Sequence, residues 1–476
     1  MPRVWDVPVH DSTRVRDARV AAEGAAELAG LDRDRADAAA LVATELATNL
    51  LKHAEGGRLL VEAVPPPDAG DGARQAPVVQ IAAVDHGPGM ADVAAALRDG
   101  YSTTRSLGAG LGTCRRVADD FHLHSTPGRG TVAVARLGAT SARSAAPAPA
   151  RPPDPAPGWP AGPATGRAAD PAGGQAANRA GGRAAGPARG ETDPARGDTG
   201  RATGAAGRSA DPAHERTAEP MPGRAPGGLA PGPAPGRTAE PAPGNAEPPL
   251  DAAGGAGRAT GATGPAASRG HGHVGVRVGG LNVPFGGGEY SGDAWGWVGA
   301  GELRTLMLAD GLGHGPDASR ASAAAVEALH RSPRLSPAEL LRQLDAALRG
   351  TRGAAVAVAQ LDLRERALRF AGIGNIGARL REPDGWRPLL SRPGIVGVHR
   401  PATLPEARLP WTDESLLIVH SDGLPSRWTP PTEPGLLTAD PALVAAVTIR
   451  DASSPARPVR DDTTVAVLAP NPPDRS

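Results

Sequence analysis

Hydrophobic residues recur with helical spacing in two stretches near the N-terminus, 14–29 and 34–53, where apolar side chains return every three or four positions. Shorter apolar runs follow them, with lengths and alternation typical of strands. The first 137 residues are therefore expected to form a mixed domain of helices and strands. The remaining predicted elements of this region are strands at 58–63, 78–84 and 130–137 and a helix at 113–121.

The same pattern in residues 273–469 favours strands over helices. Two amphipathic helices are predicted at 318–330 and 337–348. Strands at both ends of the segment with helices between them predict a layered α/β sandwich, without giving the pairing of the strands. The predicted strands are 274–278, 305–309, 355–361, 367–372, 415–421 and 464–468.

Between these two regions the hydrophobic pattern disappears. Residues 138–272 consist mostly of Gly, Pro, Ala and Arg and have almost no large apolar side chains. Such a segment cannot bury enough surface to offset the entropy lost on ordering, so we expect a disordered linker, partly flexible and partly polyproline-like. A collagen-like helix would need glycine at every third position, which this segment lacks. The predicted organisation is a domain at 1–137, the linker at 138–272, a domain at 273–469 and a tail at 470–476.

Composition and charge narrow the class of protein. Lys plus Arg equals Asp plus Glu at 51 each, so the net charge of +0 does not favour nucleic acid as a partner. The single cysteine, Cys114, cannot form an internal disulfide and is expected to be a buried structural thiol. No stretch has the features of a signal sequence, and the longest apolar runs, such as 78–84, are too short to cross a bilayer. A cytoplasmic protein with no membrane segment is expected.

One pair of polar residues lies on the predicted helix at 34–53. Glu45 and Asn49 are four positions apart, so both side chains fall on one helix face, which His53 continues. A carboxylate and an amide on one face can position a hydroxyl group and a hydrated Mg²⁺ ion. By itself such a pair is also typical of an ordinary solvated helix surface.

Two glycine-containing motifs follow along the chain. Asp85 comes directly after an apolar strand and is followed by Gly87 and Gly89, so its carboxylate can accept a hydrogen bond from a ligand amine that approaches the glycines closely. A second run of glycines opens a helix, where backbone N–H groups and the positive end of the dipole favour phosphate. Each motif alone is also typical of a plain turn or loop, whereas their order and spacing are more specific. The second motif contributes Gly108, Gly110 and Gly112.

In this order the motifs resemble the GHKL ATPase/kinase superfamily, and residues 99–137 are similar to the switch-protein serine kinases and anti-sigma factor kinases of bacterial stress signalling. The resemblance covers nearly all of 1–137. It implies a GHKL (Bergerat) α/β sandwich that binds ATP and Mg²⁺, with a serine on a small STAS-domain antagonist protein as substrate. The implied residue roles are Glu45 as catalytic base, Asn49 as Mg²⁺ ligand, Asp85 as adenine reader, the glycines as phosphate binders, and Thr131 of the GRGT turn as support for the adenine region.

The second domain carries acidic turns at the ends of its predicted strands. Carboxylate oxygens suit Mg²⁺ or Mn²⁺, and two such ions a few ångströms apart could activate a bridging water for in-line attack on a phosphoester. An Asp-Gly pair alone is typical of a turn, but several at strand ends indicate a shared site. The residues are Asp293, Asp310, Asp422 and Asp461.

This set resembles the type 2C metal-dependent (PPM) phosphatases, in particular the sporulation and stress-response branch, over about 279–468. The resemblance implies a β-sandwich flanked by helices, two Mn²⁺ or Mg²⁺ ions held by the four aspartates and the carbonyl of Gly311, and a phosphoserine or phosphothreonine substrate. Asp462 is the alternative ligand to Asp461. We interpret Asn375 as structural and His314 as part of its turn rather than as a catalytic group.

Together the motifs predict a bifunctional regulator of partner-switching control, in which one domain phosphorylates a STAS-domain protein, the other dephosphorylates it, and a sigma factor is a possible further partner. Two alternatives remain. The N-terminal domain could be a non-catalytic, anti-sigma-like module that binds ATP and a partner, leaving the phosphatase as the sole enzyme. The chain could also be a scaffold with vestigial metal turns. A histidine kinase is disfavoured, because no phosphoacceptor helix precedes the ATP-binding motifs.

Overall fold

The computed structural model describes residues 3–54, 56–67, 76–97, 110–139, 275–454 and 456–472. All of these belong to one compact unit, made of Met1–Ala150 and Ser268–Ser476. Apart from its first two residues, the predicted linker at 138–272 lies outside the described part of the chain.

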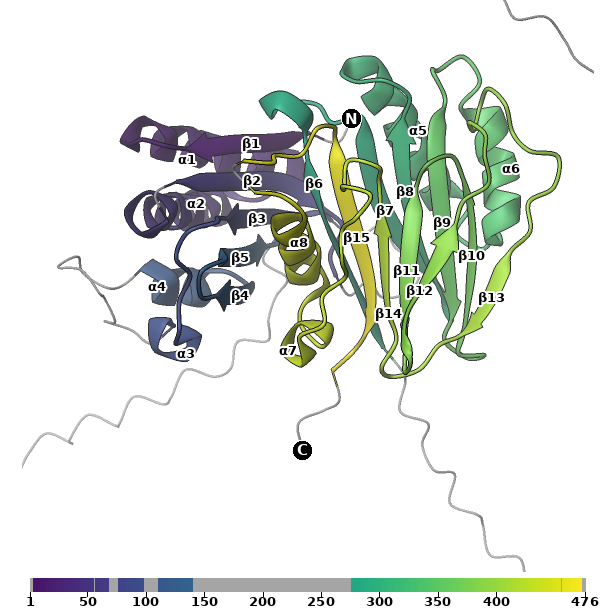
Figure 1. Cartoon of the computed structure of the whole chain (residues 1–476). Coiled ribbons are helices and arrows are strands. Elements are labelled where there is room, and N and C mark those ends of the chain that lie inside the picture. The colour runs from purple at the N-terminus through teal and green to yellow at the C-terminus, as the bar shows by residue number, and fades with distance from the viewer. Residues whose placement is uncertain are drawn as a thin grey trace, which may run out of the picture. The chain divides into compact units, whose positions relative to one another are not determined.

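The N-terminal part is a five-stranded antiparallel sheet with order β1-β2-β3-β5-β4, covered on one face by helices α1, α2 and α4 (Figure 1). A short helix, α3 (Val93–Ala96), precedes β4. The strands are β1 (Val4–Val9), β2 (Gly57–Val64), β3 (Val78–Val84), β4 (Asp120–Thr126) and β5 (Gly130–Leu137). The covering helices are α1 (Ser12–Ala29), α2 (Arg33–His53) and α4 (Gly110–Val117).

Local sequence explains why α1 and α2 begin and pack where they do. The side chains of Asp11 and Asp32 accept backbone N–H groups of the first turns, and α1 ends at Gly30 in a left-handed conformation. The buried face of α1 consists of alanines at helical spacing, which allow close approach to α2 and to the sheet. Little apolar volume is therefore needed to form this core.

The C-terminal part consists of two five-stranded sheets, with orders β13-β10-β9-β8-β7 and β12-β11-β14-β15-β6. Their inner faces share one apolar core, and α5 (Pro316–Arg331) and α6 (Pro337–Ala347) cover the outer face of the first sheet (Figure 1). The first sheet contains β7 (Asp293–Ala300), β8 (Leu303–Gly311), β9 (Ala354–Asp362), β10 (Ala367–Ile373) and β13 (Ala407–Pro410). The second contains β6 (Val276–Val283), β11 (Gly377–Glu382), β12 (Gly385–Leu390), β14 (Leu416–His420) and β15 (Thr463–Pro470). The remaining elements are the 3₁₀ turn η1 (Phe285–Gly287) and the helices α7 (Pro434–Leu437) and α8 (Pro441–Ala452).

Helix α8 lies between the second of these sheets and the N-terminal sheet. Its side chains share one core with Ile418 and Val465 on one side and with Leu60 and Val134 on the other. Residues 441–450 are all buried. The helix therefore belongs to the cores of both domains.

The predicted fold class is confirmed: a layered α/β domain is followed by a β-sandwich flanked by helices. The predicted helix at 113–121 was wrong at its C-terminal end, because α4 ends at Val117 and Phe121 lies in β4. Asp119 explains the boundary: its N–H bonds to the carbonyl of Arg136 in β5, and its carboxylate accepts the N–H of Gly138, so pairing with β5 begins there. Among the described residues, no helix is both long and apolar enough to span a membrane.

Candidate functional sites

The first site is built around helix α2. Glu45 and Asn49 lie on the same helix face, half-buried, and the first residue of α4, Gly110, lies against both. A β-carbon on Gly110 would be 2.9 Å from Oε2 of Glu45 and 3.4 Å from the amide of Asn49. Nδ2 of Asn49 is buried and has no hydrogen-bond partner among the described residues. The structure thus brings the carboxylate, the amide and the glycine-rich helix start together.

The turn after β3 forms the second part of this site. Oδ1 of Asp85 accepts the N–H groups of Gly87, at 2.8 Å, and of Thr131, at 3.1 Å. Burial raises the pKa of Asp85 despite these hydrogen bonds. Gly130 has φ of 102°, and a β-carbon there would meet the carbonyl oxygen of Asp85 at 2.1 Å, so only glycine fits. The GRGT turn is therefore locked to the Asp85 turn.

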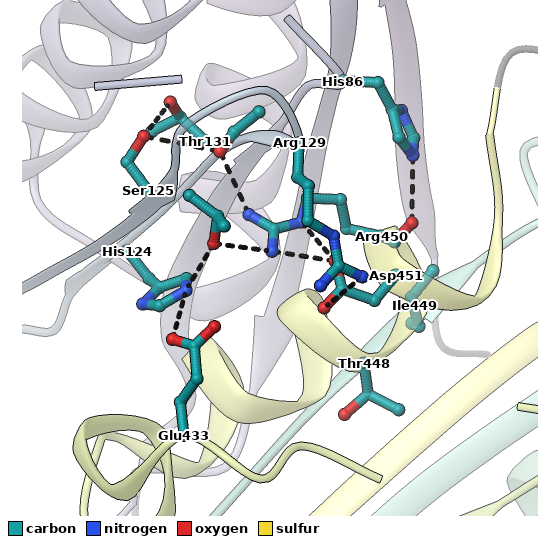
Figure 2. A network of polar contacts seen from close by, with 12 residues as sticks. His86, His124, Ser125, Arg129, Thr131, Glu433, Thr448, Ile449, Arg450 and Asp451 are labelled. Atoms are coloured by element: carbon teal, nitrogen blue, oxygen red, sulfur yellow. Dashed lines mark hydrogen bonds and ion pairs between the residues drawn. The ribbon is translucent and has the colours of Figure 1, made fainter. Parts of the chain in front are cut away.

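Helix α2 joins the two parts, because its last turn reaches the Asp85 turn. A β-carbon on Gly87 would be 2.8 Å from Cα of Ala54, directly after α2. Gly89 lies against the carbonyl of Thr126. Ser125 is a residue that the sequence analysis missed: its hydroxyl accepts the N–H of Met90 at 2.7 Å and bonds to Thr131 Oγ1 at 2.9 Å (Figure 2).

The other predicted residues of this domain have varied positions. Gly112 is buried inside α4, whereas Gly108 lies outside the described residues. His53 is exposed. Cys114 is buried, as predicted for a structural thiol, and burial raises its pKa to about 12.

The second site lies at one end of the C-terminal sandwich. Strand pairing places Asp293, the first residue of β7, directly opposite Asp310 near the end of β8. Asp422 follows β14 and Asp461 precedes β15, and these two strands are neighbours in the other sheet. The fold therefore brings aspartates from both sheets to one end of the sandwich.

These carboxyl groups lie close enough for each to affect the pKa of its neighbours. Burial, and next the charge of Asp310, raise the pKa of Asp293 well above its ordinary value. Burial and the charges of Asp422, Asp461 and Asp462 raise the pKa of Asp310 to about 7. Burial and Asp461 also raise that of Asp422. Neighbouring carboxylates disfavour each other's ionisation unless a cation neutralises them.

The two aspartates before β15 differ sharply. Both carboxylate oxygens of Asp462 accept backbone N–H groups at 2.7 Å, Oδ1 from Phe285 and Oδ2 from Gly292, and the residue is buried. Asp461 is exposed, and one of its oxygens accepts the N–H of Asp462. Asp462 therefore fastens the turn, and Asp461 has the freer carboxylate.

Asn375 lies closer to this site than its interpretation as a structural residue implied. Its Nδ2 donates to Oδ2 of Asp422 at 2.7 Å. Gly311 ends β8 next to Asp310, and a β-carbon there would meet the carbonyl oxygen of Ala318 at 2.0 Å. His314 is exposed.

The aspartates suit a hydrated divalent cation. The carboxyl group of Asp293 is buried and lies opposite that of Asp310, and a nearby positive charge would stabilise two such neighbouring buried carboxylates. In the described part of the chain, no three His, Cys, Asp or Glu side chains are gathered tightly enough to enclose a metal ion. Mg²⁺ needs no such cage, because it keeps several waters and takes one or two carboxylates. The donor set is thus of the kind that Mg²⁺ or Mn²⁺ prefers.

Two segments of the chain match known protein families. Residues 9–136 match the family described as Histidine kinase-like ATPase domain, and residues 302–470 match Stage II sporulation protein E (SpoIIE). The chain therefore carries an RsbT-like, kinase-type ATPase domain and a SpoIIE-type PP2C phosphatase domain.

Individual relatives were found for each domain. Serine/threonine-protein kinase RsbT of Bacillus subtilis (strain 168) is 38% identical over 88 residues, which are 18% of this chain and 61% of RsbT. A solved structure of RsbX in complex with magnesium is 20% identical, with a TM-score of 0.36, over 41% of this chain and 96% of that chain. The phosphatase domain of SpoIIE from Bacillus subtilis, solved with a fragment of its regulatory domain, is 17% identical with a TM-score of 0.36, over 41% of this chain and 64% of that chain.

Proposed function

We propose that the chain is a bifunctional regulator of partner switching, with serine kinase activity in residues 1–137 and metal-dependent serine/threonine phosphatase activity in residues 273–469. Both activities would act on a STAS-domain antagonist protein in control of a sigma factor. The supporting observation is that two separate sets of residues, each suited to one half of a phosphorylation cycle, converge in one chain. Two enzymes on one chain act on one target at a raised effective concentration.

In the kinase domain, Glu45 would take the proton from the attacking serine hydroxyl. Asp85 would accept a hydrogen bond from the adenine amine, with its Oδ1 already held by Gly87 and Thr131. The side-chain oxygen of Asn49 would hold Mg²⁺ beside the phosphates. Gly110, which has no side chain, allows the start of α4 to approach Glu45 closely, so that its backbone N–H groups would face the phosphates.

In the phosphatase domain, two Mg²⁺ or Mn²⁺ ions would be held by the aspartates and by the carbonyl of Gly311. When bound, such a pair supplies an activated water and positive charge for in-line attack on a phosphoester. Asn375 would orient Asp422 through its 2.7 Å hydrogen bond. Asp462 would hold the turn that presents Asp461. The four proposed ligand side chains are Asp293, Asp310, Asp422 and Asp461.

The phosphatase is tested by hydrolysis of an aryl phosphate with Mn²⁺ or Mg²⁺, with chelator, and in the variants Asp310→Asn and Asp422→Asn. We expect metal-dependent hydrolysis that falls at least about 100-fold in either variant, because each removes a carboxylate from the metal site. Hydrolysis that survives chelation, or that is unchanged in both variants, would contradict the assignment. Absence of hydrolysis in the unaltered protein at saturating metal would favour the scaffold alternative.

The kinase is tested by transfer of label from γ-labelled ATP to a purified STAS-domain protein, with Asp310→Asn in the background to prevent dephosphorylation. Glu45→Ala should bind ATP but lose transfer about 100-fold or more, since general bases contribute on the order of 10²–10⁴. Unchanged transfer would refute the role of Glu45. Nucleotide binding without transfer in the unaltered domain would instead favour the non-catalytic, anti-sigma-like alternative.

A further inference from the structure

The C-terminal end of α8 reaches the proposed adenine site. The side chain of Arg450 is 1% exposed, and its Nη1 donates to the carbonyl oxygen of Gly130 at 3.1 Å. Its Nη2 lies 3.4 Å from Oγ1 of Thr126, and its Nε donates to Asp451 at 2.8 Å. A residue of the phosphatase domain is thus buried against the GRGT turn of the ATPase domain.

Further contacts hold the same end of α8 to the ATPase domain. Nε2 of His86, next to Asp85, lies 3.0 Å from the carbonyl oxygen of Arg450 and 3.2 Å from that of Ser453. Arg129 forms an ion pair with Asp451 at 3.3 Å. Figure 2 shows the Arg450 side chain directed toward the residues around Thr131. Both turns that surround Asp85 therefore contact α8.

Arg450 is linked to Asp85 in two ways. The carbonyl that it binds belongs to Gly130, and the next N–H, that of Thr131, donates to Oδ1 of Asp85. Its positive charge also opposes the burial that raises the pKa of Asp85, which favours the ionised carboxylate. An ionised Asp85 is the form that accepts a hydrogen bond from an adenine amine.

The same helix is connected to the proposed metal site. In the chain, α8 lies between Asp422 and Asp461. It packs on β15, which begins just after Asp461, and on β6. Residues 441–450 of α8 are buried between two sheets. A displacement of one end of the helix must therefore also displace the side chains that pack against it.

We propose that Arg450 is a positioning residue of the nucleotide site and that α8 couples nucleotide binding in the ATPase domain to the activity of the phosphatase domain. Nucleotide binds against the Asp85 and GRGT turns, these turns hold the end of α8 through Arg450, and α8 packs on β15, the strand that begins just after Asp461. Nucleotide binding therefore raises phosphatase activity, and by linkage the docked helix raises nucleotide affinity. This inference rests on the proposed function of both sites.

The affinity arm uses the full chain and a non-hydrolysable ATP analogue, measured by calorimetry. Arg450→Ala should weaken binding about fivefold or more, a typical size for coupling between sites, and Arg450→Lys should recover most of this loss because it keeps the charge. Arg408→Ala is the matched control. Arg408 is exposed, forms an ion pair with Glu365 and lies on β13, in the first sheet of the C-terminal part. Equal affinities in Arg450→Ala and Arg408→Ala would overturn the proposal. Thermal unfolding of each variant identifies any that does not fold, and Arg450→Gln, which removes the charge but keeps an N–H donor, carries the test if Arg450→Ala does not fold.

The activity arm measures kcat/KM for an aryl phosphate with and without saturating analogue. The unaltered chain and Arg408→Ala should be activated about threefold or more, as expected for a coupling of this size. Arg450→Ala, and Asp85→Asn as a variant defective in nucleotide binding, should show a ratio of one. A ratio of one in the unaltered chain would overturn the coupling. A chain without any metal-dependent hydrolysis would contradict the proposed function instead, and the affinity arm would still decide the role of Arg450.

Discussion

At the scale of single residues, Asp461 and Asp462 are neighbours with opposite environments, so their substitution should have opposite effects. Asp461→Asn should remove phosphatase activity with little change in stability, because its carboxylate is exposed and keeps an oxygen for the N–H of Asp462. Asp462→Ala should lower the free energy of unfolding by about 2–4 kcal/mol, since two backbone N–H groups lose a charged acceptor. Aryl phosphatase assays and urea unfolding measure the two effects. An Asp461→Asn variant with full activity would show that the ligand had been assigned wrongly.

Glu62 of β2 gives a prediction on pH. It is 5% exposed, accepts a hydrogen bond from Gln80, and burial raises its pKa to about 8 from 4.5. Between these values the folded chain binds a proton that the unfolded chain does not, so this group lowers stability as pH rises through that window. Glu62→Gln cannot ionise and keeps the acceptor oxygen. It should equal the unaltered chain near pH 4 and be more stable near pH 9, by on the order of a few kcal/mol.

Urea unfolding at both pH values measures this difference. Glu27→Gln, on the exposed face of α1, is the matched control. A Glu62→Gln variant that is less stable than the unaltered chain at pH 9 would mean that the buried carboxylate is stabilised by its neighbours.

Candidate functional residues could be predicted from the sequence where their neighbours indicate a turn, a strand end or a helix start. The aspartates and glycines stand in turns next to apolar strands, so residue type and neighbours sufficed to propose them as candidates. Asn375 and Ser125 act through hydrogen bonds to residues 47 and 35 positions away, to Asp422 and Met90. No local pattern carries such a contact. The same limit left Asp461 and Asp462 as alternatives, because only the fold shows which one binds the backbone of 285 and 292.

At the scale of elements, the helices with one apolar face were predicted, whereas α8 was not. Its sequence, PALVAAVTIRDA, is apolar on nearly all sides because the helix is buried between two sheets, so it lacks the periodicity that marks a surface helix. Strand β4 was also not predicted, but for a different reason. Its residues, DFHLHST, mix polar and apolar types at half-buried positions, and they continue from a helical segment without a breaker.

The close packing of α8 on β6 yields a prediction with a control inside the chain. A β-carbon on Gly279 would lie 2.6 Å from the backbone nitrogen of Ala442 in α8, so helix or strand must move. Gly279→Ala should lower the free energy of unfolding by about 1–3 kcal/mol through overpacking. Gly435→Ala, in α7, has nothing within 4 Å of the added carbon and should be neutral or slightly stabilising. Equal effects of the two substitutions in urea unfolding would contradict the packing argument.

At the scale of the whole molecule, the contact between the two domains is polar as well as apolar. The N–H group of the Gln80 side chain donates to the carbonyl of Gly280 at 2.8 Å. Arg136 of β5 forms a double hydrogen bond with Asp440, at 2.9 and 2.6 Å, and both side chains are at most 4% exposed. Burial raises the pKa of Asp440, but the Arg136 guanidinium outweighs this effect and the net pKa is lowered. Asp440 also caps α8.

This buried pair makes the two domains depend on each other for stability. Arg136→Met leaves the charge of Asp440 buried without its partner, so the free energy of unfolding should fall by about 3–5 kcal/mol. Adding Asp440→Asn should restore most of the loss, because no charge is then left uncompensated and asparagine still caps the helix. Calorimetric unfolding of the full chain measures both effects, and the single variant should lower the transition of each domain, since α8 belongs to both cores. Two results would show that the ion pair does not hold the domains together: a shift of only one unfolding transition in Arg136→Met, or a double variant no more stable than the single one. The coupling through α8 would then depend on its apolar contacts and on Arg450 alone.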